Sequence, residues 1–178
     1  AYAVDQFIAV GDSGVVSRSP DGIAWALDTM DGKGTLRSVA GGGNKAVAVG
    51  DAGKVVVTTD GAAWLQVDVG TTVGLRSVIW DGHQFVVVGE SGTLLESPDA
   101  QTWTKGQIFT QAGLVKVQLA GNRLFALDDD GVIWRKNDTA VWVKSSPASA
   151  IFKMLSGSID SGLIAIDINS RLWKSSNG

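Results

Sequence analysis

One seven-residue pattern recurs along this chain of 178 residues and decides its architecture. It reads SPDGIAW at 19–25, TTDGAAW at 58–64, SPDAQTW at 97–103 and KNDTAVW at 136–142, and SSNG at 175–178 begins a fifth copy. Successive copies are 39 residues apart. A glycine turn keeps the same spacing, as GDSG at 11–14, GDAG at 50–53 and GESG at 89–92. Two independent position sets share one period, so the chain is a tandem repeat.

Each repeat carries the pattern of four short strands. An apolar run, such as FVVV at 85–88, precedes the glycine turn, and a second run leads from that turn to the seven-residue pattern. A third run carries the tryptophan, and a fourth, such as LRSVAG at 36–41, follows a looser connector. No 3.6-residue period persists, which indicates strands. Four strands in about 40 residues are typical of a β-propeller blade, whereas solenoid coils are shorter. We therefore predict an all-β fold, a β-propeller of about five four-stranded blades.

The predicted units form a single domain over 1–178, with the boundaries 1–39, 40–78, 79–117, 118–156 and, in part, 157–178. Because Gly178 aligns with Gly22, the last blade lacks its outer strand. The inner strands are all present, so we expect the central ring to close. The strand at 170–176 then has an open edge. This edge stays unpaired, is completed by another chain or segment, or belongs to a larger propeller completed by oligomerisation.

The SxDGxxW pattern resembles the Asp-box, or BNR-type, repeats of sialidases and secreted bacterial propellers. The spacing here is one residue shorter, and this short form resembles repeats of bacterial surface proteins and of photosystem II assembly-factor propellers. An aspartate in such a turn accepts backbone N–H bonds, and the tryptophan attaches the outer strand to the sheet. We interpret the following box residues as structural: Asp21, Trp25, Asp60, Trp64, Asp99, Trp103, Asp138, Trp142 and Asn177.

The sialidase family uses three arginines that bind a carboxylate, a tyrosine nucleophile with a glutamate partner, and an aspartate that acts as the acid. The only tyrosine is Tyr2, at the start of the chain. Arg37 and Arg76 share one unit position, but the fourth and fifth units carry Val115 and Met154 there. The sialidase set is therefore absent.

A second acidic position recurs inside the glycine turns. It is occupied by Asp12, Asp51, Glu90 and Asp129, and Ile168 breaks the series. In a propeller these turns lie together on one face, which suggests a face for a ligand, a cation or a basic partner. The alternative is that acidic residues simply suit solvated turns. Calcium needs about six to eight oxygen ligands, and only the run 128–130 could hold one locally, so we predict no metal and no cofactor.

Two further interpretations concern residues outside these series. Trp134 and Trp173 share one unit position and are expected to pack between blades. His83 aligns with Asn44 and Asn122, which suggests a turn position that tolerates positive φ, so we interpret His83 as a structural residue.

Composition excludes several classes of function. The net charge is −3, which does not favour a nucleic-acid partner. No apolar run approaches the length of about 20 residues that a membrane span needs. The chain has no cysteine, which excludes disulfides and thiolate metal sites, and its single histidine excludes a histidine-pair metal site.

These features predict a non-enzymatic binding or scaffold module that engages a protein partner or a glycan on one face. No unit carries the inserted loops on which propeller enzymes place catalytic residues. One alternative is a lectin-like propeller that binds carbohydrate in aromatic clefts between blades, and another is an assembly factor for a larger complex. Self-association or strand donation is expected at 170–176. The resemblance implies an extracellular or cell-surface location and a bacterial source.

Overall fold

The computed structural model describes residues 1–30, 34–145, 150–158 and 162–175, and nineteen strands account for most of them. Sheet 1 contains β1 (Tyr2–Ala3), β2 (Gln6–Val10), β3 (Val15–Ser19) and β4 (Ala26–Thr29). Sheet 2 contains β5 (Leu36–Gly42), β6 (Lys45–Gly50), β7 (Val55–Thr58) and β8 (Leu65–Val67). Sheet 3 contains β9 (Leu75–Trp80), β10 (Phe85–Gly89), β11 (Leu94–Ser97) and β12 (Thr104–Lys105).

The last two sheets continue the same order. Sheet 4 contains β13 (Leu114–Ala120), β14 (Arg123–Asp128), β15 (Ile133–Lys136) and β16 (Trp142–Lys144). Sheet 5 contains β17 (Phe152–Ser158), β18 (Gly162–Asp167) and β19 (Leu172–Ser175). Every pair of neighbouring strands is antiparallel and consecutive in sequence. The all-β propeller prediction is confirmed, and the fifth sheet has three strands in the residues that the structure describes.

Consecutive sheets pack face to face, with a cluster of buried apolar side chains between each pair. In β6, Ala46 and Ala48 belong to the cluster shared with sheet 1, whereas Val47 and Val49 belong to the cluster shared with sheet 3. The second strands of sheets 3 and 4 divide their side chains in the same way. Because both faces of an inner sheet are covered, the middle residues of these strands are all apolar and do not alternate with polar residues.

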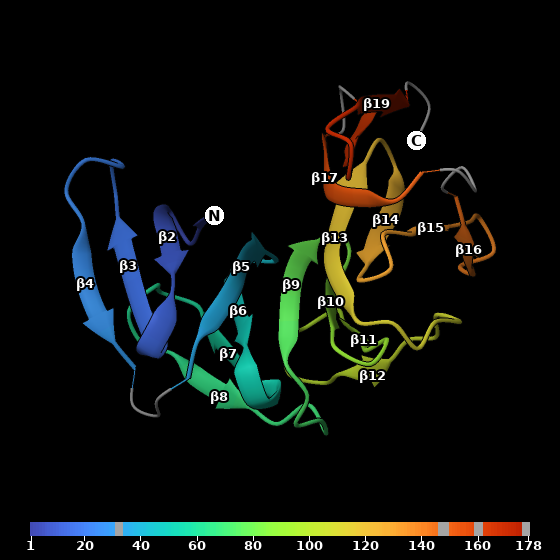
Figure 1. Cartoon of the computed structure of the whole chain (residues 1–178). Coiled ribbons are helices and arrows are strands. Elements are labelled where there is room, and N and C mark those ends of the chain that lie inside the picture. The colour runs from blue at the N-terminus through green and yellow to red at the C-terminus, as the bar shows by residue number, and fades with distance from the viewer. Residues whose placement is uncertain (31–33, 146–149, 159–161, 176–178) are drawn as a thin grey trace.

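The five sheets follow one another along an open arc, with sheets 1 and 5 at its two ends (Figure 1). The expected closure of the ring is therefore not observed among the described residues. The end sheets each have one face that no other sheet covers. On sheet 1, Phe7 is 40% exposed, whereas Phe85, its equivalent in sheet 3, is 1% exposed. The outer face of sheet 5 likewise exposes Met154 and Leu172.

The open edge predicted at 170–176 lies on β19. This strand pairs only with β18 in the part of the chain that the structure describes. Trp173 pairs with Ala165 and packs on the cluster shared with sheet 4, whereas Leu172 pairs with Ile166. Strand donation or self-association at this edge remains a prediction.

The unbroken period conceals a one-residue shift in the fifth repeat. The inner strands β5, β9, β13 and β17 each carry a bulge near the start of the strand. Each bulge leaves one residue unpaired, which is Arg37 in β5, Arg76 in β9, Val115 in β13 and Lys153 in β17. The sequence alignment placed Met154 at this position, and that assignment is wrong. Ser158 pairs with Gly162, whereas Ala120 pairs with Arg123, so one more residue separates the paired ends in sheet 5 than in sheet 4, and this extra residue restores the period.

The repeat offers a matched test of burial by neighbouring sheets. We expect Phe85→Ala to lower the free energy of unfolding by about 3–5 kcal/mol, because it leaves a cavity between sheets 2 and 3. Phe7→Ala removes the same side chain from an uncovered face and should cost less than about 1.5 kcal/mol. Urea unfolding of both variants measures the difference. Equal losses would contradict the open arc.

Candidate functional site

The turns between the second and third strands of the sheets gather at one end of the molecule, which we call the hairpin end. They span 11–14, 50–53, 89–92, 128–131 and 167–170. The first two form short 3-10 turns, Asp12–Gly14 and Asp51–Gly53, whose central and last residues have positive φ. A Cβ on Gly53 would lie within van der Waals overlap of the Thr71 carbonyl. The connector between sheets therefore packs directly on the turn, and glycine is required there.

The four acidic residues predicted for this face do lie in these turns, and arginines or a threonine contact them. Arg37 Nε donates to Asp51 Oδ1 at 2.5 Å. Arg76 Nη1 reaches from sheet 3 to both carboxylate oxygens of Asp129 in sheet 4, at 2.8 and 2.9 Å. The same guanidinium lies 3.5 Å from Glu90. Asp12 accepts a hydrogen bond from Thr35 Oγ1 at 3.1 Å.

Arg37 and Arg76 are therefore the functional candidates that the sequence interpretation missed on this face. Both arginines lie at the bulge of their strand, where a side chain points in a different direction than it would in a regular strand. Hydrogen bonding and charge from Asp51 raise the pKa of Arg37, and the charges of Glu90 and Asp12 add to this effect. Carboxylates from three sheets thus act on one guanidinium. We call Asp12, Arg37, Asp51, Arg76, Glu90 and Asp129 the charged row.

Three exposed apolar residues, which we call the apolar patch, lie at the hairpin end of sheets 4 and 5. Its residues are Val115, Ile151 and Ile168, which are 37–56% exposed. Val115 takes the bulge position of the arginines, and Ile168 takes the position of the acids. The Ile168 N–H donates to the Ile151 carbonyl at 2.9 Å, which holds two of these residues together.

At the opposite end, the turns between the third and fourth strands contain the Asp-box residues; we call it the box end. Asp21 Oδ1 accepts hydrogen bonds from the Ile23 and Ala24 N–H groups at 2.8 and 3.0 Å. Asp60 and Asp99 make the same pair of bonds in their own turns. These backbone N–H donors lower the pKa of all three carboxyls. Asn177 lies outside the described residues.

The fourth copy of the box departs from this arrangement, so the structural role predicted for Asp138 is wrong. Asn137 holds the turn: its Oδ1 accepts bonds from the Thr139 and Val141 N–H groups at 3.1 and 2.9 Å. The residue with positive φ is Ala140, one position later in the box than in the first three copies. Asp138 is released into solvent and pairs with Arg123 at 3.1 Å. Lys136 replaces the serine or threonine of the other boxes and donates to Glu96 of sheet 3 at 2.6 Å.

The box tryptophans pack toward the preceding sheet, and their burial depends on whether a preceding sheet covers them. Trp64 packs on the cluster between sheets 1 and 2, and Trp103 on the cluster between sheets 2 and 3. Trp142 is 2% exposed, but Trp25, which directly precedes β4 in the first sheet of the described structure, is 47% exposed. The role of these residues is thus to join sheets, in addition to attaching the outer strand.

Sheets 4 and 5 replace a glycine of the hairpin end by a buried aspartate that contacts a tryptophan. Trp134 Nε1 donates to Asp128 Oδ2 at 2.8 Å, and Trp173 Nε1 donates to Asp167 Oδ2 at 3.1 Å. Earlier repeats carry Gly11, Gly50 and Gly89 at the aspartate position. Trp134 and Trp173 pack on the clusters between sheets, as expected, and also carry this specific polar contact.

Asp167 is the most strongly perturbed of these carboxyls. Desolvation by burial raises its pKa, but hydrogen bonds from the Arg171 N–H, Trp173 Nε1 and the Arg171 guanidinium outweigh it and lower the pKa to about 2. Asp128 also faces inward, so the run 128–130 does not gather its carboxylates. Among the described residues, no group of three or more histidine, cysteine or acidic side chains could hold a metal ion. No helix in the described ranges is long and apolar enough to cross a membrane.

Five stacked antiparallel sheets with a common turn chemistry define a β-propeller repeat protein. The chain belongs to the family described as the DUF6242 beta propeller domain, whose family model matches residues 66–178. No curated protein matches the chain.

Solved structures show the same fold. YCF48 bound to a D1 peptide matches with a TM-score of 0.78 and 17% identity, over 96% of this chain and 61% of that chain. Virginiamycin B lyase from Staphylococcus aureus matches with a TM-score of 0.77 and 12% identity, over 94% and 64% of the two chains. The WD40 propeller domain of Doa1 matches with a TM-score of 0.71 and 14% identity, over 100% and 68%. The chain thus spans about three fifths of the length of YCF48.

The lowered pKa of Asp167 in sheet 5 predicts how the stability of the fold changes in acid. Because the folded-state pKa of Asp167 is below its ordinary value of 3.8, its stabilising contribution is complete above that value and is lost as pH falls through about 2. We expect Asp167→Asn to flatten the fall in stability between about pH 4 and 2. Urea unfolding at several pH values measures this. The exposed Asp130→Asn variant is the control, and an equal flattening there would contradict the prediction.

The reassigned turn of sheet 4 gives a second test. Asn137→Ala should lower the melting temperature, because it removes a side chain that caps two backbone N–H groups, a loss of about 1 kcal/mol for comparable caps. Asp138→Ala should leave the melting temperature nearly unchanged, since Asp138 is exposed and holds no backbone group. Thermal unfolding followed by circular dichroism compares the two. The reverse order would restore Asp138 as the box residue.

Proposed function

We propose that this chain is a non-enzymatic binding module that holds an extended segment of a protein partner on its hairpin end. The observation that carries the proposal is the charged row together with the apolar patch, which place exposed charged and apolar side chains at the hairpin end of all five sheets. Three of the charged row's four carboxylates, those of Asp51, Glu90 and Asp129, already pair with arginines of the row. The surface therefore suits a partner that replaces one member of such an ion pair better than it suits a free cation.

The energetics of exposed ion pairs favour such exchange. Surface pairs stabilise a fold by only about 0–1 kcal/mol each, since water solvates the separated charges well. The side chains of the Arg37–Asp51 and Arg76–Asp129 pairs are 28–48% exposed. A partner can therefore replace one member of a pair at little cost to this fold. The apolar patch supplies the area whose removal from water favours binding.

A peptide is the partner class that the fold comparison supports, because YCF48 has been solved bound to a D1 peptide. Such a segment would lay charged side chains on sheets 2 to 4 and an apolar side chain on Val115, Ile151 and Ile168. An assembly factor, which holds a segment of a complex during its construction, is a special form of the same proposal. The proposal includes an extracellular or cell-surface location, which rests on the Asp-box resemblance and which protease treatment of intact source cells would test.

Selection of linear peptides from a displayed random library tests the surface directly. We expect selected peptides to shift the backbone NMR signals of 12–14, 51–53, 90–92 and 129–131. Arg76→Glu should weaken their binding at least about tenfold, because a charged hydrogen bond becomes a like-charge contact.

Arg18→Glu is the matched control, because Arg18 forms an ion pair of 3.1 Å with Asp28 on sheet 1, away from the row. Its binding should be unchanged. Peptides that shift other residues, or that bind both variants equally well, would exclude the hairpin end as the binding surface.

A further inference from the structure

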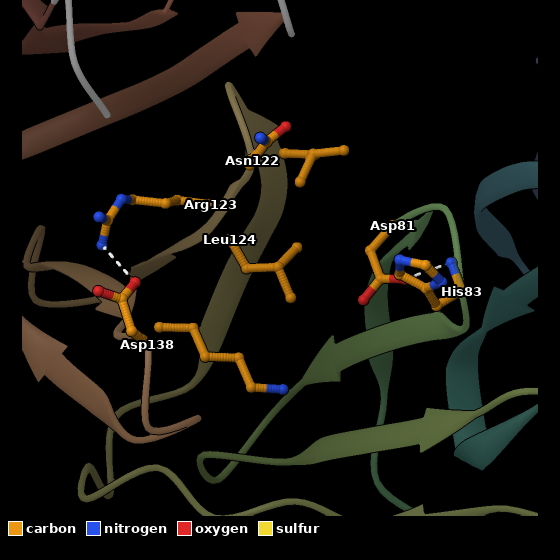
Figure 2. Close-up of a pocket in the computed structure, with 8 residues that line it drawn as sticks. Asp81, His83, Asn122, Arg123, Leu124 and Asp138 are labelled. Carbon is orange, nitrogen blue, oxygen red and sulfur yellow. Dashed lines mark hydrogen bonds and ion pairs between the residues drawn. The ribbon is translucent and has the colours of Figure 1, made fainter.

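A cavity of about 330 Å³ opens between sheets 3 and 4 at the box end (Figure 2). It lies far from the hairpin end along the strands, and nothing in the proposed peptide-binding surface accounts for it. Asp81 and His83 line it from the turn between β9 and β10. Arg123, Lys136 and Asp138 line it from sheet 4.

A hydrogen bond that joins sheet 1 to sheet 2 and sheet 2 to sheet 3 is missing beside this cavity. Gln6 of sheet 1 donates to the Asp60 carbonyl in the box turn of sheet 2 at 3.0 Å, and Lys45 of sheet 2 donates to the Asp99 carbonyl of sheet 3 at 2.5 Å. Gln84 is the equivalent residue of sheet 3. In the described part of the chain, no hydrogen bond joins the Gln84 side chain to sheet 4. The box turn that it would reach is the one rearranged around Asn137.

The same rearrangement supplies the polar wall on sheet 4. In the other boxes, the aspartate and its serine or threonine partner form hydrogen bonds within the turn, as Ser19 and Asp21 do. In sheet 4 both positions are freed, as Lys136 and Asp138. Figure 2 shows Asp138 directed toward Arg123 on one side of the cavity, with Asp81 and His83 on the other side.

Several polar atoms facing the cavity remain without a protein partner. Asp81 Oδ1 accepts from the His83 and Gln84 N–H groups at 2.9 and 2.8 Å, which leaves its second oxygen unused. The His83 ring is exposed and has no hydrogen bond in the described structure. His83 does not have positive φ in this turn, because Gly82 takes that conformation, with φ of 102°. Its ring is thus a candidate ligand contact rather than a requirement of the turn.

We propose that this cavity binds a neutral, hydroxyl-rich ligand of monosaccharide to disaccharide size. Its charged lining groups balance, with Asp81 and Asp138 against Arg123 and Lys136, so a ligand with net charge gains little. Hydroxyl groups donate and accept at once, and therefore suit walls that mix carboxylates with guanidinium, imidazole and amide groups. Leu119 and Leu124 provide an apolar contact for the C–H face of a sugar ring. The volume lies at the lower end of the range of about 300–1,000 Å³ for small-ligand sites.

This site differs from the aromatic cleft that the sequence suggested for carbohydrate. The exposed Trp25 lies in a separate open groove on sheet 1, beside Gln6 and Arg18. That groove lies on the uncovered face of sheet 1. In the inner sheets, the equivalent residues pack against a neighbouring sheet. The cavity between sheets 3 and 4 is instead enclosed by two sheets that are both present.

Saturation-transfer and amide-shift NMR on the whole chain test the proposal. The probes are glucose, galactose, mannose, N-acetylglucosamine, maltose and lactose at millimolar concentration, with glutamate as the charged comparison. We expect at least one neutral sugar to shift amides within 81–84 and 119–124. Asp138→Ala and Asn122→Ala, both at exposed side chains, should each weaken that binding about tenfold, the effect of one lost polar contact.

Asp28→Ala is the matched control, since Asp28 forms an ion pair of the same length, 3.1 Å, with Arg18 at another place. It should leave sugar binding unchanged. Three results would overturn the proposal: no neutral sugar binds, the shifts centre on Trp25, or glutamate alone binds in the cavity. Sugar binding that neither Asp138→Ala nor Asn122→Ala weakens would overturn it as well.

Discussion

Burial of both faces of a sheet by its two neighbours is the constraint on which the rest of this structure depends. Val47 and Ala48 are adjacent in β6, yet they belong to clusters on opposite sides of sheet 2. A sheet of four short strands has little core of its own, so each blade is stable mainly through the blades beside it. The uncovered faces of sheets 1 and 5 follow directly from this arrangement.

Turn chemistry is the second level of organisation, and it is local. Each turn must satisfy its own backbone N–H groups, and the chain does so in more than one way. Sheets 1 to 3 use Gly11, Gly50 and Gly89 at the start of the hairpin turn, and a Cβ on Gly50 or Gly89 would overlap the backbone of the preceding connector. Sheets 4 and 5 use a buried aspartate bound to a tryptophan. In sheet 4 an asparagine replaces the box aspartate as the capping residue. Because the alternatives are local, they change the surface without disturbing the packing between sheets.

These local substitutions give the two ends of the molecule different characters. At the hairpin end, arginines at the bulges of sheets 2 and 3 pair with acidic residues of the turns, and exposed apolar residues lie at the same end of sheets 4 and 5. At the box end, the rearranged turn of sheet 4 frees Lys136 and Asp138 and leaves a cavity. A repeat that is uniform in its core therefore carries non-uniform surfaces, and we expect its recognition functions to reside where the repeat is broken.

The sequence by itself determined the repeat, the strand order and the fold class, because these depend on periodic burial and on turn residues that are readable from spacing. It also located the turns that hold Asp12, Asp51, Glu90 and Asp129. Tertiary structure decided the pairing of those acids with Arg37 and Arg76, since Arg76 reaches its partner in the next sheet. It also decided that Asn137 replaces Asp138 and that Lys153 replaces Met154 in the alignment. Both corrections are one-residue shifts, which leave a 39-residue period intact and appear only when backbone hydrogen bonds fix the register.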